Sequence, residues 1–197
     1  MNKKLFSLTM ILCLFLLSGC SKNKDSQDIL QKILQRDKII VGVKYDTKPF
    51  GFIDENQVLK GYDVDLAKYI AKSILGDENK VEFKQVTSSN RILALNSSQV
   101  DMVIATMTIT DQRKQVINFS IPYYVAGQAV LVPKDSKINS ISDLNGQRVI
   151  IIFGSTSEKN LRMVAPYAKI LGFKTYTSGY SALKQGRADA MSSDDTI

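Results

Sequence analysis

The sequence predicts an α/β fold built from mostly parallel sheets. Short runs of β-branched residues, such as 39–43 and 148–153, alternate with segments whose apolar residues recur at helical spacing. Between residues 39 and 106 the order is strand, helix, strand, helix, strand. This alternation favours parallel strands joined by helical crossovers. The almost continuous apolar character of 148–153 indicates a strand that is covered on both faces.

The first nineteen residues are predicted to be a signal peptide. Lys3 and Lys4 precede a mainly apolar stretch, 5–17, which is too short to span a bilayer. Leu-Ser-Gly directly before Cys20 resembles the lipobox of bacterial lipoproteins. That resemblance implies cleavage before Cys20 and a lipid anchor on it, strong enough to hold a protein at a membrane surface. A plain secretory signal with an incidental cysteine is the alternative.

Residues 20–36 are predicted to form a polar tether and then a short helix. The stretch 21–27 is polar and basic, as expected of a linker. Apolar residues then recur at helical spacing, namely Ile29, Leu30, Ile33 and Leu34.

Composition excludes several function classes. The chain has no histidine, and its two cysteines are Cys13, inside the signal, and the acylated Cys20. We therefore expect no disulfide, no Cys or His metal site and no His-dependent catalysis. The formal charge of +7 includes Lys3 and Lys4, and the remaining basic residues are dispersed. Because the basic residues are dispersed, they lack the clustered pattern of a nucleic-acid surface. The positive balance favours anionic ligands or an anionic cell surface. We expect no cofactor and no metal.

The first half of the chain places loops after predicted strands. The strand 39–43 is followed by the loop 44–52, at the end of a sheet where open α/β folds bind ligands. Gly61 then closes a turn and Asp63 is predicted to cap a helix that ends at Gly76. A strand follows at 81–86, and a short helix begins near Arg91.

The segment after the third strand has the pattern of a small anion site. Thr106, Thr108 and Thr110 alternate, so an extended segment would put their hydroxyls on one side. Thr110 is a helix N-cap signal, and Arg113 falls in the first helical turn, where a cation opposes the helix dipole unless an anion answers it. A strand-turn-helix with a solvated Arg113 is the alternative.

The second half repeats the alternation. Strands are predicted at 129–132 and 148–153, with a turn of helix at 142–146 between them. The segment 154–158 opens a helix whose free N–H groups and hydroxyls suit an anion, although it lacks the ending of a nucleotide-binding P-loop. A helix over 161–171, kinked or divided at Pro166, and a strand over 173–177 are expected next.

Three motifs resemble the extracellular solute-binding proteins of family 3, the receptors of polar amino acid ABC transporters. They are Gly-Tyr-Asp-Val-Asp-Leu at 61–66, Thr-Ile-Thr-Asp-Gln-Arg at 108–113 and Asn-Phe-Ser-Ile-Pro-Tyr-Tyr at 118–124. The resemblance implies a periplasmic-binding-protein-like α/β fold with two lobes joined by a hinge. Lobe 1 would span 37–122, the hinge 123–127 and an incomplete lobe 2 128–197. Family members continue beyond the point matching Ile197, so a missing C-terminal part is expected.

The resemblance also implies roles for individual residues. Arg113 and Thr108 would hold the α-carboxylate of an amino acid, with Thr156 and Ser155 closing on it from lobe 2. Thr106 and Asp194 would hold the ammonium, with Asp195 or a helix cap as the competing interpretation for Asp194.

The remaining candidates surround the ligand's side chain. The Ser-Ser-Asn-Arg-Ile motif at 88–92 resembles acidic-amino-acid receptors, in which Arg91 would meet a distal carboxylate; a solvated surface Arg91 is the alternative. Lys44 or Lys48 would add a second cation for that distal carboxylate; the alternative is that each lysine is solvated. Phe50 would pack on the ligand's aliphatic part or belong to the core. Asp46 is a carboxylate of the same loop.

These expectations describe the binding component of an amino acid ABC importer, with glutamate or aspartate favoured. It would be a monomer, lipid-anchored on the extracytoplasmic face of the cell membrane, and would deliver its ligand to a membrane permease with a separate ATPase subunit. A dehydratase-like enzyme, the regulatory lobe of a lytic transglycosylase, or a ligand-sensing domain of a kinase or channel on the same fold are the alternatives. The enzyme alternative needs an acid/base residue of raised pKa in the cleft, and the loop carboxylates have no evident partner.

Overall fold

The computed structural model describes residues 29–197. The predicted signal peptide, the lipidation site Cys20 and the polar tether therefore lie outside the described residues. The chain divides into two compact units, Met1–Lys32 and Ile33–Ile197, and the description that follows concerns the second. Helix α2 (Ile29–Arg36) is the helix predicted from apolar spacing. Over 29–197, no helix is both long enough and apolar enough to cross a membrane.

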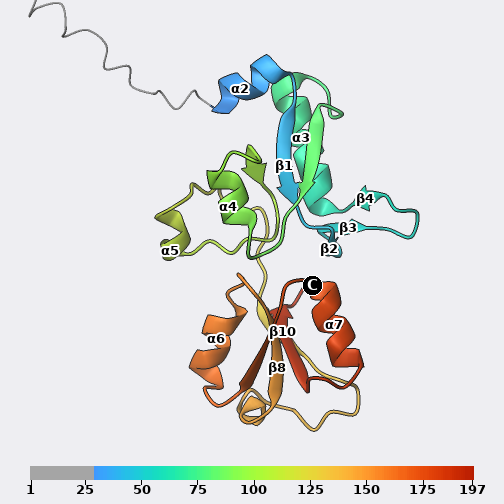
Figure 1. Cartoon of the computed structure of the whole chain (residues 1–197), viewed down its shortest axis with the longest axis vertical. Helices are drawn as coiled ribbons and strands as arrows, with labels where there is room; N and C mark the ends of the chain where they lie inside the picture. Colours follow the sequence, from blue (N-terminus) through green and yellow to red (C-terminus); the bar gives the residue numbers. More distant parts are fainter. Residues whose placement is uncertain (1–28) are drawn as a thin grey trace, which may run out of the picture. The chain divides into compact units, whose positions relative to one another are not determined.

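The first sheet is parallel, as predicted. Its strands β1 (Ile39–Val43), β5 (Val81–Gln85) and β6 (Met102–Val103) lie in the order β5-β1-β6. Helix α3 (Tyr62–Leu75) connects β1 to β5, and α4 (Arg91–Asn96) connects β5 to β6 (Figure 1).

Side chains of β1 alternate between two cores. Val41 and Val43 pack with Val64 of α3, whereas Ile40 packs with Ala94 of α4 on the other face. Because successive strand side chains point to opposite faces, one apolar strand supplies both cores.

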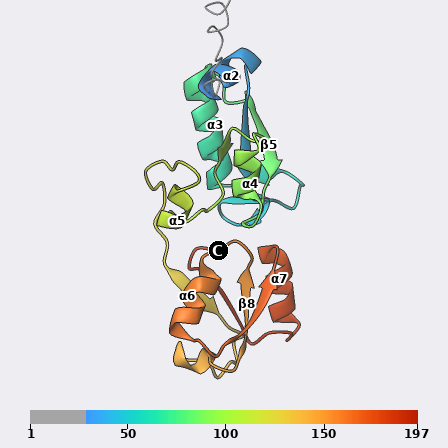
Figure 2. The same ribbon diagram turned by 60° about the vertical axis from the view of Figure 1, so that its left-hand side comes forward.

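The second sheet has one antiparallel edge. Its strands are β7 (Gln128–Leu131), β8 (Arg148–Ile152), β9 (Lys169–Phe173) and β10 (Ala190–Asp194), in the order β7-β10-β8-β9. Only the β7–β10 pairing is antiparallel among these strands. Helices α6 (Ser157–Val164) and α7 (Tyr176–Lys184) cover opposite faces (Figures 1 and 2). A short 3₁₀ turn, η2 (Ser142–Leu144), lies before β8, where the sequence predicts a turn of helix.

Both parallel units share one strand order, with the first strand in the middle. In the first unit, β1 comes first in the chain and lies between β5 and β6. In the second unit, β8 comes first of its three parallel strands and lies between β9 and β10. In each unit the first crossover leads from the middle strand to one side, and the second crossover passes over the middle strand to its other side. Ligands of such sheets bind at the carboxyl ends of the strands, where the direction of the connections changes. The predicted division into lobes with a hinge at 123–127 stays a prediction.

A small antiparallel sheet is inserted between β1 and α3. Its strands are β2 (Asp46–Thr47), β3 (Gly51–Ile53) and β4 (Leu59–Lys60). Gly61 follows with φ 122°, and a Cβ there would lie 2.1 Å from the Phe50 carbonyl oxygen. Only glycine fits this turn, which holds Phe50 against the start of α3.

The predicted helix over 161–171 and strand over 173–177 are wrong in their bounds. Helix α6 ends at Val164, two residues before Pro166, and β9 already begins at Lys169. Thr175 then N-caps α7 by accepting a hydrogen bond from the Ser178 amide (3.2 Å). The residue before a proline avoids the helical conformation, so the helix stops instead of kinking.

The predicted capping role of Asp63 is also wrong. Helix α3 begins at Tyr62 after Gly61, and no side chain caps it. Asp63 is fully buried, and its carboxylate accepts a hydrogen bond from the Tyr123 hydroxyl (3.1 Å). An aspartate before an apolar run looks the same in sequence whether it caps the helix or lies inside its first turn.

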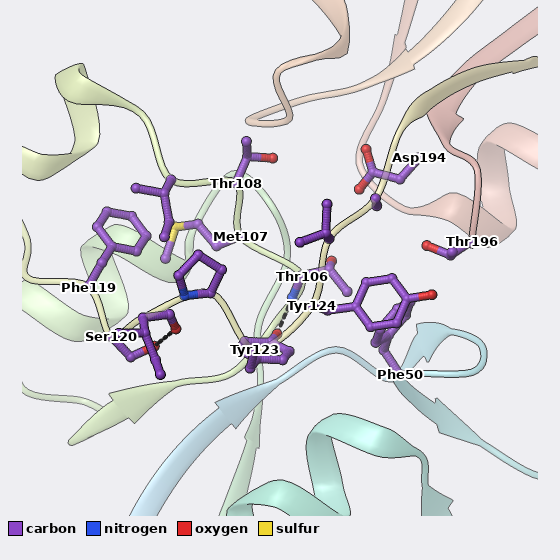
Figure 3. A pocket seen from close by; sticks show the side chains of 15 residues that line it. Phe50, Thr106, Met107, Thr108, Phe119, Ser120, Tyr123, Tyr124, Asp194 and Thr196 are labelled. Atoms are coloured by element: carbon purple, nitrogen blue, oxygen red, sulfur yellow. Dashed lines mark hydrogen bonds between the residues drawn. The ribbon is translucent and has the colours of Figure 1, made fainter.

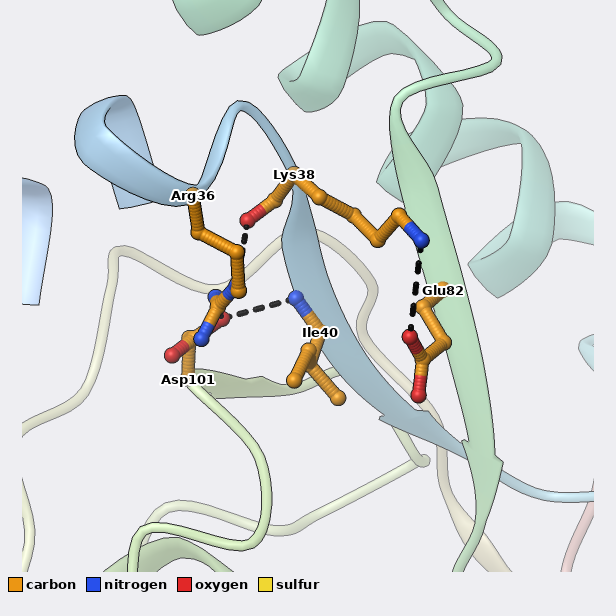
Figure 4. Close-up of polar contacts among 5 residues, drawn as sticks. All are labelled: Arg36, Lys38, Ile40, Glu82 and Asp101. Carbon is orange, nitrogen blue, oxygen red and sulfur yellow. Dashed lines mark hydrogen bonds and ion pairs between the residues drawn. The ribbon is translucent and has the colours of Figure 1, made fainter. Parts of the chain in front are cut away.

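Asp101 connects the start of β6 to β1, as Figure 4 shows. Its carboxylate accepts the Ile40 amide (2.7 Å) and pairs with Arg36. Only 9% of the Asp101 side chain is exposed, against 44% of Glu82, which pairs with Lys38 at 3.8 Å.

We predict that Asp101→Ala lowers the free energy of unfolding by about 1–3 kcal/mol, because it leaves a partly buried backbone amide without its acceptor. The measurement is urea unfolding. Glu82→Ala is the matched control and should change it by less than about 0.5 kcal/mol, as expected of an exposed ion pair. Equal effects of the two substitutions would contradict this assignment.

Candidate ligand-binding site

Segments that follow strands of the two parallel sheets meet at one place. The Gly154 carbonyl, just after β8, accepts hydrogen bonds from Arg113 Nη2 (2.8 Å) and Arg91 Nη2 (3.4 Å). Asp46, just after β1, accepts the amide of Tyr176 at the start of α7 (2.8 Å). These contacts join the carboxyl-end segments of one sheet to those of the other.

A cavity of about 270 Å³ lies in this region (Figure 3). Thr106 and Thr108 line it from the segment after β6, and Asp194 lines it from the end of β10. Phe50 and a run of largely apolar residues complete it, among them Tyr123, Tyr124, Val125 and Ala126. Mixed apolar and polar walls of this kind suit a small polar molecule with an aliphatic part.

Thr106 presents an unused hydroxyl to this region. Its backbone has φ 47°, an unusual value for a threonine, and its amide donates to the Tyr123 hydroxyl (3.3 Å). Among the described residues, its buried Oγ1 has no hydrogen-bond partner. Strained backbone and an unpaired buried hydroxyl are common where a protein is organised for a ligand.

The Tyr123 hydroxyl in turn donates a hydrogen bond to the Asp63 carboxylate (3.1 Å). Burial raises the pKa of Asp63 to about 6, while the hydrogen bond from Tyr123 opposes the rise. Burial and the Asp63 charge raise the pKa of the Tyr123 hydroxyl, which therefore remains protonated as the donor. The chain from Thr106 through Tyr123 to Asp63 sets the position of the segment after β6.

Arg113 lies where the sequence predicts it, in the first turn of α5 (Asp111–Lys114). The Thr110 side chain caps that helix by accepting the Arg113 amide (3.2 Å), so the predicted cap is confirmed. The guanidinium donates to the Thr108 carbonyl (2.6 Å) as well as to Gly154, and burial lowers its pKa. Arg113 is therefore directed toward the segment after β8, and is not the solvated residue of the alternative interpretation.

Arg91 is buried, with 2% of its surface exposed, so the solvated alternative is wrong. Its Nη1 donates to the Ala105 carbonyl (2.5 Å), and its Nε has no partner among residues 29–197. Burial and the neighbouring Arg113 charge lower the pKa of Arg91 to about 10. Two guanidinium groups thus lie close together and are satisfied mainly by neutral carbonyls.

The two lysines of the 44–52 loop have different environments. Lys44 is 2% exposed, and its Nζ lies 4.4 Å from the centre of the Tyr176 ring. Lys48 is exposed, with its Nζ 5.2 Å from the Phe52 ring. Burial and the Arg91 charge lower the pKa of Lys44 to about 7. Burial of Lys44 is a feature that sequence reasoning missed, because both lysines occur in the same polar loop.

The carboxylates of the region also differ in their partners. Asp195 accepts the Gly127 amide (3.1 Å), and Asp46 accepts from Tyr176 and from Thr47 (3.2 Å). Asp194 lines the cavity instead, and burial raises its pKa while the Lys44 charge opposes the rise. Asp194 is therefore the carboxylate of this group that faces the cavity.

The remaining candidates lie at the edge of the site. Phe50 is buried and packs edge-to-face on Tyr124, with ring centres 5.1 Å apart, so it belongs to the core and to the cavity wall. Thr156 is the N-cap residue of α6 without a side-chain cap bond. Ser155 Oγ accepts the Ser157 amide (3.3 Å). Within residues 29–197, no cluster of carboxylates, histidines or cysteines could hold a metal ion.

Mostly parallel sheets with this strand order, and a cavity of mixed polar and apolar walls beside their carboxyl ends, are typical of a protein that binds small molecules. The chain belongs to the bacterial extracellular solute-binding proteins, family 3, whose model matches residues 39–197. Like its relatives, which are binding proteins, it is a binding protein and not an enzyme.

Three curated relatives show the range of the family. The chain is 45% identical to a glutamine-binding protein of Geobacillus stearothermophilus, covering 97% of this chain and 79% of the relative. It is 43% identical to the ABC transporter glutamine-binding protein GlnH of Bacillus subtilis, covering 99% and 76%. Identity falls to 32% with the glutamate-binding protein GluB of Corynebacterium efficiens, in a match that covers 92% of this chain and 63% of the relative.

Solved structures agree on the fold. A cysteine-binding protein from Campylobacter jejuni superposes with a TM-score of 0.81 at 40% identity, covering 84% of this chain and 66% of that one. An ancestral arginine-binding protein bound to glutamine superposes with a TM-score of 0.76 at 45% identity, covering 81% and 70%. The predicted periplasmic-binding-protein-like fold is therefore confirmed.

The buried Asp63 carboxyl should make stability depend on pH. Its folded pKa, about 6, lies above the ordinary 3.8, so the folded state binds this proton more tightly. The stability that the protonated carboxyl contributes is present at acidic pH and is lost as pH rises through 6. We predict that the free energy of unfolding of Asp63→Asn rises relative to that of the wild type by up to about 3 kcal/mol between pH 4 and pH 7.

The measurement is the free energy of unfolding across that pH range. Asp65→Asn, at an exposed position of the same helix, is the control for removing a carboxylate charge from α3. A difference between Asp63→Asn and the wild type that does not vary with pH would show that the Asp63 carboxyl is not held protonated by the fold.

Proposed function

We propose that this chain is the substrate-binding component of a polar amino acid ABC importer and that its ligand is glutamine. One observation carries the proposal: Thr106, Thr108 and Asp194 line a single cavity, and the Arg113 guanidinium is bonded within the same segment to the Thr108 carbonyl. Asp194 supplies an anion at the cavity wall, and Arg113, which is bonded to the cavity-lining Thr108, supplies a cation next to it; an amino acid carries the two complementary charges. The identities with two glutamine-binding relatives support the choice of ligand.

Arg113 is the proposed anchor of the α-carboxylate. Its guanidinium now donates to two neutral carbonyls, those of Thr108 and Gly154. A carboxylate would offer the same donors a charged and bidentate acceptor, which makes a stronger hydrogen bond than a carbonyl does. The N-terminus of α6, with Ser155 and Thr156, would add backbone N–H groups to the same anion.

Asp194 is the proposed anchor of the α-ammonium, with the unpartnered Thr106 hydroxyl beside it. Asp194 is half-buried and lines the cavity. An ammonium donates three hydrogen bonds, so a carboxylate and a hydroxyl together satisfy most of its capacity. Asp195 suits this role less well, because the Gly127 amide already uses its carboxylate.

Glutamate is the second candidate. Arg91 and Lys44 are both buried cations of this site, which is the pattern that would neutralise a distal carboxylate. Glutamine is favoured because two glutamine-binding relatives are 45% and 43% identical to this chain, against 32% for a glutamate-binding relative. In addition, the Ala105 carbonyl already accepts a hydrogen bond from Arg91. An amide oxygen accepts a hydrogen bond without requiring the site to neutralise a whole charge.

The other parts of the proposal follow from the role of a transport receptor. Closure around the amino acid would present a loaded form to a membrane permease that is served by a separate ATPase. The family is extracellular, so we place the chain on the outer face of the cell membrane, anchored through Cys20 and acting as a monomer. Use of the same fold as a ligand-sensing domain is the alternative class.

We predict that Arg113→Met weakens glutamine binding by at least about 30-fold, because truncating one partner of a buried charge pair costs about 2–5 kcal/mol. Isothermal titration calorimetry with glutamine, glutamate, aspartate and arginine gives the affinities. Arg162→Met is the control, since Arg162 is exposed on α6 and pairs with Glu158 (2.9 Å). Unchanged glutamine affinity in Arg113→Met would reject Arg113 as the carboxylate anchor.

We predict that Cys20→Ser abolishes lipidation and moves the protein from the membrane fraction to the medium, because the lipid chains carry the membrane affinity. The measurement is incorporation of a labelled fatty acid in a bacterial host, together with fractionation. Cys13→Ser lies in the predicted signal and should leave both readouts unchanged. Continued labelling of Cys20→Ser would place the lipid elsewhere.

A further inference from the structure

The backbone of Thr106 is held in a conformation that threonine rarely adopts. Its φ of 47° lies in the left-handed region, where a β-branched side chain is crowded. Such a conformation costs free energy and persists only where neighbouring groups hold it. The strain falls on a residue that lines the cavity and whose buried Oγ1 has no hydrogen-bond partner within residues 29–197. The groups that hold Thr106 therefore also decide where this hydroxyl lies.

Tyr123 holds Thr106 through its own hydroxyl. The Thr106 amide donates to Tyr123 Oη (3.3 Å), as Figure 3 shows. The same hydroxyl donates to Asp63 Oδ1 (3.1 Å), so its orientation is fixed by a donor on one side and an acceptor on the other. Because 17 residues separate Thr106 from Tyr123, this restraint is a tertiary contact and not part of the local turn.

Asp63 is the fixed end of this chain of hydrogen bonds. It lies in the first turn of α3, is fully buried, and its amide donates to the Phe50 carbonyl (2.9 Å). Of the three residues, Thr106 and Tyr123 line the cavity and Asp63 does not. A hydrogen-bonding effect of Asp63 on a ligand therefore passes through Tyr123.

Stability alone is a poor reason for this arrangement. Burying a carboxylate is costly, and Asp63 Oδ2 has no hydrogen-bond partner in the described part of the chain. Apolar side chains of the same shape would fill the space without that cost. What the carboxylate adds is a directed acceptor, because hydrogen bonds to charged groups are stronger than those between neutral groups. The result is an oriented Tyr123 hydroxyl, and through it an oriented Thr106.

We infer that Asp63 and Tyr123 are positioning residues of the binding site: they hold the strained backbone of Thr106 and thereby keep its hydroxyl where the ammonium of a bound amino acid lies. This inference rests on the proposed function, in which Thr106 and Asp194 hold that ammonium. It adds that ligand affinity depends on a chain of hydrogen bonds reaching back 60 residues from Tyr123 to α3. A hydroxyl that is already in place need not be ordered when the ligand binds, so its positioning raises affinity.

The test is a double-mutant cycle measured by calorimetric titration of the whole chain with glutamine. Tyr123→Phe removes the bridging hydroxyl, and Thr106→Val removes the hydroxyl that it positions while keeping a branched side chain. Each should weaken glutamine binding at least about fivefold, since each removes a hydrogen-bonding group. The double variant should bind no more than about twofold more weakly than the weaker single variant, because both changes act through one group. Tyr69→Phe, at an exposed tyrosine of α3, is the matched control and should bind as the wild type does.

Asp63 is tested by two substitutions at the same position. Asp63→Asn keeps an oxygen that accepts from Tyr123, whereas Asp63→Ala keeps none. Glutamine binding should be at least about fivefold weaker in Asp63→Ala than in Asp63→Asn. Urea unfolding of both variants is measured alongside, because a purely structural role would change stability and leave the Kd of the folded protein unchanged. If Asp63→Ala does not fold, the cycle of Tyr123 and Thr106 decides the matter.

Three results would overturn the inference while glutamine binding by the wild type still supports the proposed function. They are an unchanged glutamine affinity in Tyr123→Phe, losses that multiply in the double variant, and equal affinities of folded Asp63→Asn and Asp63→Ala. Failure of the wild type to bind glutamine, glutamate or arginine overturns the proposed function and the inference with it.

Discussion

Every proposed contact of this protein depends on one topological constraint. In both parallel units the first strand lies in the middle of the sheet, so the chain returns to the same carboxyl edge after each crossover. Lys44 and Asp46 follow β1, the two threonines follow β6, and Asp194 ends β10. Residues more than a hundred positions apart thereby meet, as in the hydrogen bond between Tyr176 and Asp46. The fold supplies the site by aligning strand ends, and loop residues supply its chemistry.

Bringing several charged side chains together inside the fold costs free energy. Arg91 and Lys44 are each 2% exposed, and Asp63 is fully buried. Burial shifts the pKa of each toward the neutral form, which is the expected response of charges taken out of water. The Asp46, Asp63 and Asp194 charges compensate that of Lys44 in part, and under the proposed function a zwitterionic ligand would add to this compensation.

A backbone carbonyl accepts hydrogen bonds from both guanidinium groups of the site. The Gly154 carbonyl accepts from both Arg91 and Arg113, and a Cβ on Gly154 would lie 2.4 Å from the Ser88 carbonyl oxygen. This close approach needs a glycine, whose φ of 79° is also in the left-handed region. Hydrogen bonds of this kind are exchangeable, because a carboxylate competes well against a neutral carbonyl for a guanidinium.

Sequence by itself determined the order of strands and helices, the Thr110 cap and the position of Arg113 in its first turn. These are local features, set by periodicity and by contacts over a few residues. The helix end at Val164 was mispredicted although a local signal, Pro166, sets it. The role of Asp63 was mispredicted because a tyrosine sixty residues away decides it. Tertiary structure alone decided which of Lys44 and Lys48 is buried, and which of Asp194 and Asp195 faces the cavity. Adjacent polar residues look alike in a sequence, and only packing against distant segments determines which of them is removed from water.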